Sequence, residues 1–292
     1  MNEKKQRLLA QAALIFATIV WGSGFAVVKN TLLVLRPMWV STLRFVISTV
    51  LMGIIFFKRI SKSTKSDVKM GLIAGLPLFF ANTAQIVGAQ WTSAGKNAFL
   101  TSVYVVIVPF LSIIFLKNKV DRYNFFAAFI CMGGVGLLTL EKDLSVNIGD
   151  VFTLACAVLF ALHIITVSRA KDNDFIAITF FQMAVTAALS LLCAALFEGA
   201  MPRLTAQVFL ATSYLGIFGN MLAFTFQTFA QRHVSASHAS LLLSLEAVFG
   251  VFISSIALKE KIDLKMLIGC ALILSAVVVS ETKLAFFKNG TE

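Results

Sequence analysis

The stretch SAGKNAFLTSVYVVIVPFLSIIFLKNKVD, residues 93–121, decides the fold because the chain contains it twice. Its copy is SASHASLLLSLEAVFGVFISSIALKEKID, residues 235–263. The two align without a gap at an offset of 142, and 12 of the 29 positions are identical. Each copy is one apolar run that begins with small polar residues and ends in a Lys-x-Lys-x-Asp motif. This pattern predicts an internal duplication.

The composition predicts an all-α membrane protein. The chain has 292 residues, of which 59% are hydrophobic and 13% charged, whereas soluble domains have about 45–50% and 25%. Its apolar runs are continuous over about 20 residues, the length of a membrane-spanning helix, and do not alternate like the strands of a membrane barrel. The net charge of +11 lies mostly in short connections. This placement indicates membrane orientation and contact with anionic lipid, and we expect no nucleic-acid partner.

Two further features exclude other classes of protein. The apolar run at 8–28 has no small-residue cleavage site, so it is interpreted as the first membrane helix and not as a signal peptide. The cysteines lie inside apolar runs without close pairing, and we expect neither disulfides nor a metal site, nor any cofactor. They are Cys131, Cys156, Cys193 and Cys270.

Hydropathy predicts ten spans, five in each half of the chain. Because five is odd, the second half enters the bilayer upside down relative to the first. We therefore expect ten transmembrane helices as two inverted five-helix repeats, in residues 1–143 and 144–292. The predicted spans are 8–28, 38–57, 68–88, 94–116, 123–140, 149–168, 175–197, 205–229, 235–258 and 264–280.

The basic residues predict the orientation. With the N-terminus inside, the connections on the cytoplasmic side carry 16 Lys and Arg residues and those on the other side carry 8. The cluster at 259–265 opposes this assignment, but the early connections favour it and usually dominate insertion. We expect a multi-pass protein of the plasma or inner membrane with both termini in the cytoplasm.

The motifs around the repeated stretch resemble those of the EamA-type transporters, a branch of the drug/metabolite transporter superfamily. The first-half pattern A-x-[YW]-T-S-A-G-x-A-x-F-L-T-S-x-Y-x-x-x-x-P is matched at Ala89, Trp91, Thr92, Ser93, Ala94, Gly95, Phe99, Leu100, Thr101, Ser102, Tyr104 and Pro109. The second-half pattern, L-E-P-V-F with a later charged corner, is matched at Leu245, Glu246, Val248, Phe249, Lys259, Glu260 and Lys261. Trp21, Gly22 and Arg44 also fit.

The resemblance implies ten-helix exporters or exchangers of metabolites, with widely differing substrates. Two departures matter. Ala247 stands where the family usually has proline, so the resemblance implies that the ninth span lacks its usual kink. Asn118 replaces the glutamate expected at the first corner.

Three ionisable residues within the spans are candidates for transport, since a charge at the centre of a span costs about 2.5–3.5 kcal/mol and needs a partner or a wet cavity. Arg44 faces a cavity or extends to the membrane surface. Glu246 carries a coupling proton or contacts the solute, or it makes a fixed structural bond, for example with Arg44. His163 takes part in transport or is an interhelical hydrogen-bond donor.

Uncharged polar and aromatic residues complete the predicted cavity. Asn82 and Gln85 share one helix face because they are three residues apart. For each amide, plain helix packing is an alternative. The amides are Asn82, Gln85, Gln182, Asn220 and Gln227, and the predicted aromatic walls are Trp21 and Tyr104.

Prolines and glycines predict where helices bend or pack closely. Pro77 and Pro109 fall inside spans, where each removes a helical hydrogen bond and favours a kink. Gly71 and Gly75 form a small-residue face for close helix contact. Gly216 and Gly219 in the eighth span are predicted to have the same role.

These features favour a secondary transporter that exports or exchanges small amino-acid-like, amphipathic or cationic metabolites by alternating access, with possible proton coupling. The partners are then a small solute and the lipid bilayer, while monomer and homodimer remain open. A nucleotide-sugar or sugar-phosphate carrier is the alternative, although only Arg44 lies well inside a span. A membrane enzyme is disfavoured because no metal or nucleophile motif is present in the sequence. A channel remains a further alternative.

Overall fold

The computed structural model describes residues 2–92, 94–117, 121–139, 147–258 and 264–282, and this part is helical and contains no strand. Most of the two Lys-x-Lys-x-Asp motifs, together with Asn118 and Glu260, lies outside the described residues. The helices are α1 (Glu3–Thr31), α2 (Pro37–Ile55), α3 (Phe57–Ile60), α4 (Lys65–Trp91), α5 (Ala94–Ser102), α6 (Tyr104–Leu116), α7 (Arg122–Thr139), α8 (Ile148–Arg169), α9 (Phe175–Cys193), α10 (Ala206–Tyr214), α11 (Ala223–Ala230), α12 (Ala236–Leu243), α13 (Leu245–Leu258) and α14 (Leu264–Thr282), with the π-helices η1 (Ala194–Glu198) and η2 (Leu215–Leu222).

Each predicted span coincides with one helix or with consecutive helices. Six of these segments are long and apolar enough to cross a membrane, namely α1, α2, α4, α8, α9 with η1, and α10 to α11. Shorter apolar helices occur at Leu100–Leu116, Ala236–Gly250 and Leu264–Ser280. The chain is therefore an integral multi-pass membrane protein.

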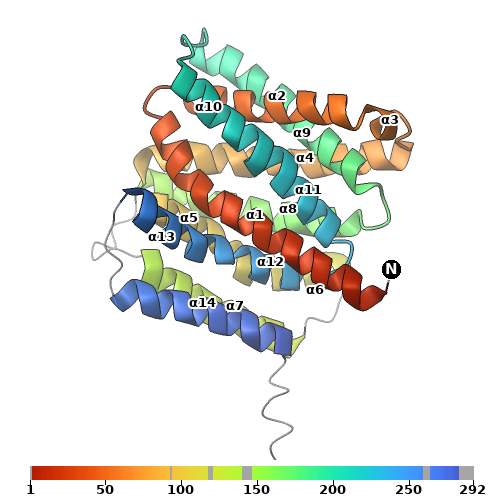
Figure 1. Ribbon diagram of the computed structural model, residues 1–292, viewed down its shortest axis with the longest axis vertical. Helices are drawn as coiled ribbons and strands as arrows, with labels where there is room; N and C mark the ends of the chain where they lie inside the picture. Colours follow the sequence, from red (N-terminus) through yellow and green to blue (C-terminus); the bar gives the residue numbers. More distant parts are fainter. Residues whose placement is uncertain (1, 93, 118–120, 140–146, 259–263, 283–292) are drawn as a thin grey trace, which may run out of the picture.

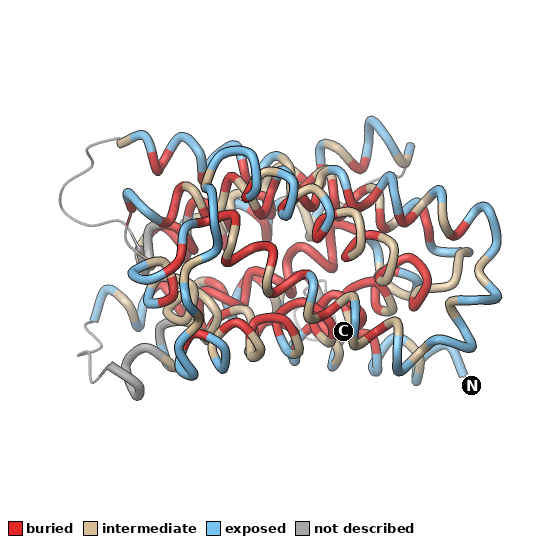
Figure 2. Tube along the Cα trace, turned by 90° about the horizontal axis from the view of Figure 1, so that it is seen from above, coloured by how far each residue is buried: buried red, intermediate tan, exposed pale blue. Residues whose placement is uncertain are grey.

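Apolar side chains cover the outside of the bundle as well as its inside. Figure 2 shows buried residues along the inner sides of the helices and exposed residues around the periphery. Large apolar residues are among the most exposed, such as Ile54 at 70% and Phe197 at 78%. This is expected of a surface that faces lipid, where backbone groups are satisfied within helices.

The packing of the helices pairs corresponding segments of the two halves. α2 packs against α9, and α7 lies beside α14, as Figure 1 shows at its lower edge. α1 packs against α11 and α13, while α4 packs against α8 and α9. The central helices α1, α4 and α8 thereby lie between the outer pairs α2–α9 and α7–α14.

Glycines allow close approach at two of these contacts. A Cβ atom added at Gly71 would lie 2.5 Å from Phe181 Cβ, and one at Gly75 would lie 2.8 Å from Val185 Cβ. Both positions therefore pack α4 tightly on α9, as the small-residue face predicts. Gly216 packs in the same way on α2, where an added Cβ would lie 2.8 Å from the Arg44 backbone oxygen. Gly219 differs, because nothing lies within 4 Å of such an atom.

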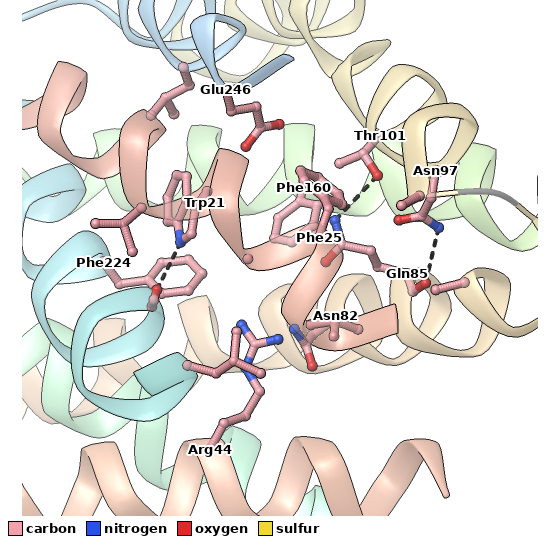
Figure 3. Close-up of a pocket in the computed structure, with 18 of the residues that line it drawn as sticks. Trp21, Phe25, Arg44, Asn82, Gln85, Asn97, Thr101, Phe160, Phe224 and Glu246 are labelled. Carbon is pink, nitrogen blue, oxygen red and sulfur yellow. Dashed lines mark hydrogen bonds between the residues drawn. The ribbon is translucent and has the colours of Figure 1, made fainter. Parts of the chain in front are cut away.

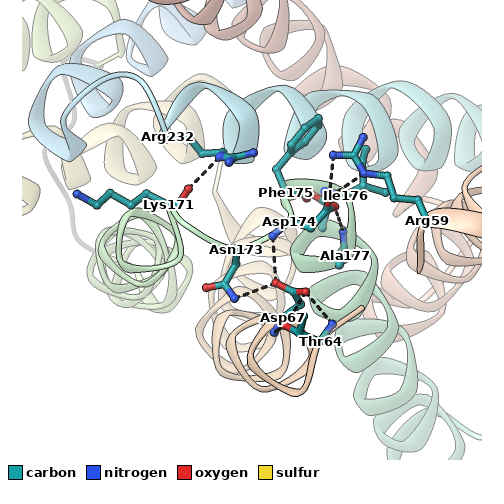
Figure 4. Close-up of polar contacts among 11 residues, drawn as sticks. Arg59, Thr64, Asp67, Lys171, Asn173, Asp174, Phe175, Ile176, Ala177 and Arg232 are labelled. Atoms are coloured by element: carbon teal, nitrogen blue, oxygen red, sulfur yellow. Dashed lines mark hydrogen bonds and ion pairs between the residues drawn. The ribbon is translucent and has the colours of Figure 1, made fainter. Parts of the chain in front are cut away.

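Carboxylates hold α2 and α9 together at both ends. At one end, the Glu198 carboxylate accepts hydrogen bonds from the backbone N–H groups of Met38 (2.8 Å) and Trp39 (3.1 Å) in the first turn of α2. At the other end, Arg59 forms an ion pair of 2.7 Å with Asp174, the residue that caps α9 (Figure 4). An acidic group at a helix N-terminus is favourable in both cases.

Asp67 joins the start of α4 to the connection before α9 (Figure 4). It accepts a hydrogen bond from the backbone N–H of Thr64 (2.8 Å), closing a capping box. Its other oxygen accepts from Asn173 Nδ2 (2.8 Å) and from the backbone N–H of Asp174 (3.0 Å). The first and second halves of the chain are thus linked at this end of the bundle.

One expectation about the ninth span is wrong. The absence of a proline at Ala247 implied a helix without a kink, but the span is divided at Ser244 into α12 and α13. The Ser244 hydroxyl donates to the Leu241 carbonyl at 2.6 Å, and the Ala247 N–H bonds back only three residues, to Ser244 O at 3.2 Å. The span is thus interrupted at Ser244 without a proline.

Candidate functional site

A cavity of about 890 Å³, its mouth included, lies in the middle of the bundle (Figure 3). Its lining residues come from α1, α2, α4, α5, α6 and α8 and from η2, α11, α12 and α13, so both halves contribute.

Seven of the ten predicted cavity residues line this space. They are Trp21, Arg44, Asn82, Gln85, Tyr104, Gln227 and Glu246. The other three, His163, Gln182 and Asn220, are fully buried but are not among the lining residues.

His163 and Gln182 form a polar pair behind the aromatic wall. His163 Nε2 lies 2.8 Å from Gln182 Oε1. The His163 ring also packs edge-on against the rings of Phe160 and Phe224, which do line the cavity. This arrangement fits an interhelical hydrogen bond between α8 and α9.

Arg44 is 6% exposed and lines the cavity from α2. Its Nε and Nη2 atoms donate to Asn220 Oδ1 at 3.0 and 2.7 Å. Within the described ranges, no carboxylate forms an ion pair with it. The positive charge is therefore held in place by a neutral amide and is not neutralised.

Glu246 lies on the opposite side of the cavity from Arg44 (Figure 3) and is 4% exposed. The Tyr104 hydroxyl donates to Glu246 Oε1 at 3.4 Å, and Ser102 is a second hydroxyl neighbour. Arg44 is not its partner, so the structural bond considered for these two residues is not formed. Among described residues, Glu246 has no cationic partner.

Tyr104 and Glu246 occupy the same position of the repeated stretch, since their numbers differ by the repeat offset of 142. The two copies of the repeated stretch therefore meet at this position. The cavity therefore has a hydroxyl from one copy and a carboxylate from the other at one place.

Aromatic rings form the wall between the two charges (Figure 3). Trp21 Nε1 donates to the Gly219 carbonyl at 2.8 Å, and its ring lies 5.0 Å from that of Phe224. Phe25 and Phe160 also line the cavity. Gly219 thus contributes a carbonyl and open space to the site, in contrast to the packing role expected for it.

The sequence did not indicate two polar residues of the lining, Asn97 and Thr101. Asn97 Nδ2 donates to the Gln85 carbonyl (3.2 Å) and to Thr153 Oγ1 (2.9 Å), while Gln85 Nε2 donates to Thr101 Oγ1 (3.2 Å). A signal was present, because Asn97 stands where the family motif has alanine. Asn97 and Thr101 are also four residues apart on one helix face.

Lys29 marks the mouth of the cavity. Its Nζ donates to the carbonyls of Ala89 (2.6 Å) and Thr92 (2.9 Å) at the C-terminal end of α4. A cation at a helix C-terminus is stabilising. Ala94, at the start of α5, lines the cavity near the same end.

The opposite end of the bundle is closed. Lining residues in α1 begin at Val20, and the preceding Leu14 and Ala17 are completely buried. Beyond them, Gln11 Nε2 lies 3.4 Å from His238 Nε2, and His238 Nδ1 lies 3.4 Å from the Ser280 hydroxyl, which bonds to Asn124. This polar chain connects α1, α12, α14 and α7.

Comparisons with known proteins agree on one family. The sequence profile of the EamA-like transporter family matches residues 8–140 and again residues 147–282. An uncharacterized transporter of Archaeoglobus fulgidus is 30% identical over 95% of this chain and 87% of its own length. The uncharacterized transporter YyaM of Bacillus subtilis is 24% identical over 94% of each chain. These names describe transporters and not enzymes.

A solved structure shares the fold. This crystal structure of a protein superposes with a TM-score of 0.81, covering 95% of this chain and 98% of the other, at 17% sequence identity. At that identity the likeness concerns the architecture alone.

Proposed function

Since the chain belongs to the EamA-like transporter family, we propose that it carries small amino-acid-like solutes across a cell membrane as a secondary transporter. In this proposal, residues 1–143 and 144–292 are two inverted five-helix repeats, and one cavity between them faces either side of the membrane in turn. Export and exchange of metabolites are both compatible with this mechanism.

The repeat arrangement is supported by three observations. The family profile matches each half separately, and the two copies of the central stretch align without a gap. Corresponding spans pack against each other in the pairs α2–α9 and α7–α14. Tyr104 and Glu246, which hold one repeat position, are in contact. Each is expected of two copies related by a two-fold axis in the membrane plane.

The observation that carries the solute class is the presence in one cavity of an arginine and a carboxyl group on opposite sides, neither of them in an ion pair among the described residues. An ionised side chain in a membrane interior needs a counter-charge or water. Arg44 suits a carboxylate and Glu246 suits an ammonium group, so a zwitterion satisfies both. The aromatic rings between them suit an apolar side chain of the solute. A cationic amphipathic solute would use Glu246 and the rings alone.

The proposed orientation places both termini in the cytoplasm and the open mouth near Lys29 on the other side. Single cysteines in a cysteine-free background, at Asn2 and in the connection at 200–205, test it. A membrane-impermeant thiol reagent added to intact cells should label the connection and not Asn2. Labelling of Asn2 from outside contradicts the orientation.

Counterflow in liposomes tests transport itself. The purified full chain is reconstituted into liposomes loaded with a mixture of the twenty common amino acids, and entry of labelled amino acids is followed. A carrier should accelerate entry when the same solute is inside, whereas a channel should not. Absence of any exchange above empty liposomes contradicts the amino-acid-like class.

A pH gradient across the same liposomes tests proton coupling. Glu246 is the carboxylate of the cavity lining and so the candidate proton carrier. If it carries the proton, an imposed gradient should drive accumulation in the wild-type protein and not in Glu246→Gln. Accumulation that does not depend on the pH gradient would show that Glu246 does not carry a coupling proton.

A further inference from the structure

The cavity wall formed by α2 and α4 has hydrogen-bond donors that bind no acceptor among the described residues. Arg44 uses Nε and Nη2 to bind Asn220, and Nη1 has no partner in the part of the chain that the structure describes. A guanidinium cannot accept a hydrogen bond. Figure 3 shows the Arg44 and Asn82 side chains on the side of the cavity opposite Glu246. A group that binds here must therefore be an acceptor.

The second donor is the amide of Asn82. Its Oδ1 atom accepts from the Ser41 hydroxyl at 2.9 Å, and Ser41 lies 3.0 Å from the Ser190 hydroxyl. This buried chain leaves Nδ2 as the end of the amide without a partner among the described residues. Asn82 is 1% exposed and lines the cavity, so Nδ2 adds an N–H donor beside the charge.

Asn220 fixes the guanidinium and leaves its charge intact. One amide oxygen binds both Nε and Nη2 at 3.0 and 2.7 Å, which orients the planar group. A carboxylate in the same place would form an ion pair and neutralise Arg44. Because Asn220 is neutral, the full charge of Arg44 remains available to a solute.

The backbone around Asn220 is shaped for this contact. Asn220 lies in the π-helix η2, where a wider turn interrupts the long span from α10 to α11. Gly216 in the same turn lets α2 approach so closely that an added Cβ would lie 2.8 Å from the Arg44 backbone oxygen. Asn220 Nδ2 is buried without an acceptor among the described atoms, which is unfavourable. The turn thus holds the Asn220 oxygen against Arg44 although the Asn220 Nδ2 group has no described acceptor.

From these contacts we propose that Arg44 and Asn82 bind the carboxylate of the transported solute and that Asn220 is a positioning residue for Arg44. The carboxylate accepts hydrogen bonds from Nη1 of Arg44 and Nδ2 of Asn82. Other polar atoms of these two side chains already bind Asn220 and Ser41. This assignment rests on the proposed function and gives it an atomic basis for substrate choice.

The test compares amino acids with their methyl esters, which keep the ammonium group and side chain but lose the negative charge. Liposomes containing the full-length protein exchange either the mixture of twenty amino acids or the mixture of their methyl esters. The wild-type protein should exchange the acids at least about tenfold faster, since hydrogen bonds between charged groups are stronger than those between neutral groups.

Asn220→Asp should remove this preference, because it places a carboxylate of the same size beside Arg44. Acid flux should fall about tenfold or more relative to ester flux. Asn220→Ala keeps the charge but frees the guanidinium, and should raise KM for the acids with a smaller effect on the maximal rate. A merely structural role would lower acid and ester flux together.

Asn82→Asp provides the second variant if Asn220→Asp fails to insert, because it also places a negative charge at this wall. Equal exchange of acids and esters by the wild-type protein overturns the proposal, as does a wild-type ratio in both aspartate variants. Exchange of neither mixture contradicts the proposed function itself, a result distinct from exchange without carboxylate preference.

Discussion

The two copies of the repeated stretch have the same shape but different chemistry. Each folds as two short helices, α5 and α6 around Val103 and α12 and α13 around Ser244. Pro109 follows the first division, whereas Val251 stands at the matching position of the second copy. A proline present in only one copy does not explain a division that both copies have.

Both copies carry a serine beside the division. Ser102 and Ser244 are identical positions of the repeat. The Ser102 hydroxyl donates to the Ala98 carbonyl at 2.9 Å, and that of Ser244 donates to the Leu241 carbonyl at 2.6 Å. Ser23 and Ser275 make the same kind of bond within the undivided helices α1 and α14, so this bond alone does not divide a helix. The comparison teaches that the two copies share the division and the serine beside it, and differ two positions later, where one copy has Tyr104 and the other Glu246.

The largest expected effect comes from exchanging the unshared residue. Glu246→Gln should lower amino-acid counterflow about 100-fold, which corresponds to ~2.7 kcal/mol, because the ammonium group loses its only carboxylate in the cavity lining. Tyr104→Phe removes one weak 3.4 Å hydrogen bond and should lower counterflow only a few-fold.

These two variants are compared at equal amounts of folded protein, measured by size-exclusion chromatography in detergent. Equal losses of counterflow in Glu246→Gln and Tyr104→Phe would show that the position matters for packing and not for charge. The difference between the two copies would then lose its functional meaning.

The sequence predicted the helices well because its apolar runs are long and its connections short. Most residues predicted for a substrate cavity line the central space, since a charge or amide inside a span needs a polar environment, as Arg44 and Glu246 illustrate. That they bind a solute stays a prediction. The sequence could not predict which amides face the cavity. Asn220 and Gln227 lie on one span, yet only Gln227 lines the cavity, because the π-helical turn between α10 and α11 changes the face that each presents.

Contacts between distant residues were also beyond the sequence. Nothing in the local pattern pairs His163 with Gln182, or Lys29 with the end of α4, because these contacts depend on how helices cross. The division at Ser244 was missed for a different reason. Proline was taken as the sign of an interruption, and this copy is interrupted without one.

The next-largest expected effect is on protein stability and concerns two glycines, Gly75 in α4 and Gly219 in η2. Gly75→Leu should destabilise the protein by about 1–3 kcal/mol, the usual cost of overpacking, because its Cβ would lie 2.8 Å from Val185 Cβ. Gly219→Ala is the matched control and should leave stability nearly unchanged, since nothing lies within 4 Å of its added Cβ. Thermal unfolding of the purified variants in one detergent measures both. A Gly219→Ala variant as unstable as Gly75→Leu would contradict this difference between the two positions.

The smallest expected effect separates the serine from the proline within the first copy. Pro109 leaves the Val105 carbonyl without its helical N–H donor and so softens α6, but the helix is already divided at Val103. Pro109→Leu should therefore slow counterflow only about two- to fivefold and leave membrane insertion intact. Ser102→Ala removes the hydroxyl that bonds to Ala98 and lies near Glu246, and should slow counterflow at least as much. The two variants are measured side by side against the wild-type rate. Wild-type flux in Pro109→Leu removes the proline from the mechanism, whereas wild-type flux in Ser102→Ala removes the shared serine from it.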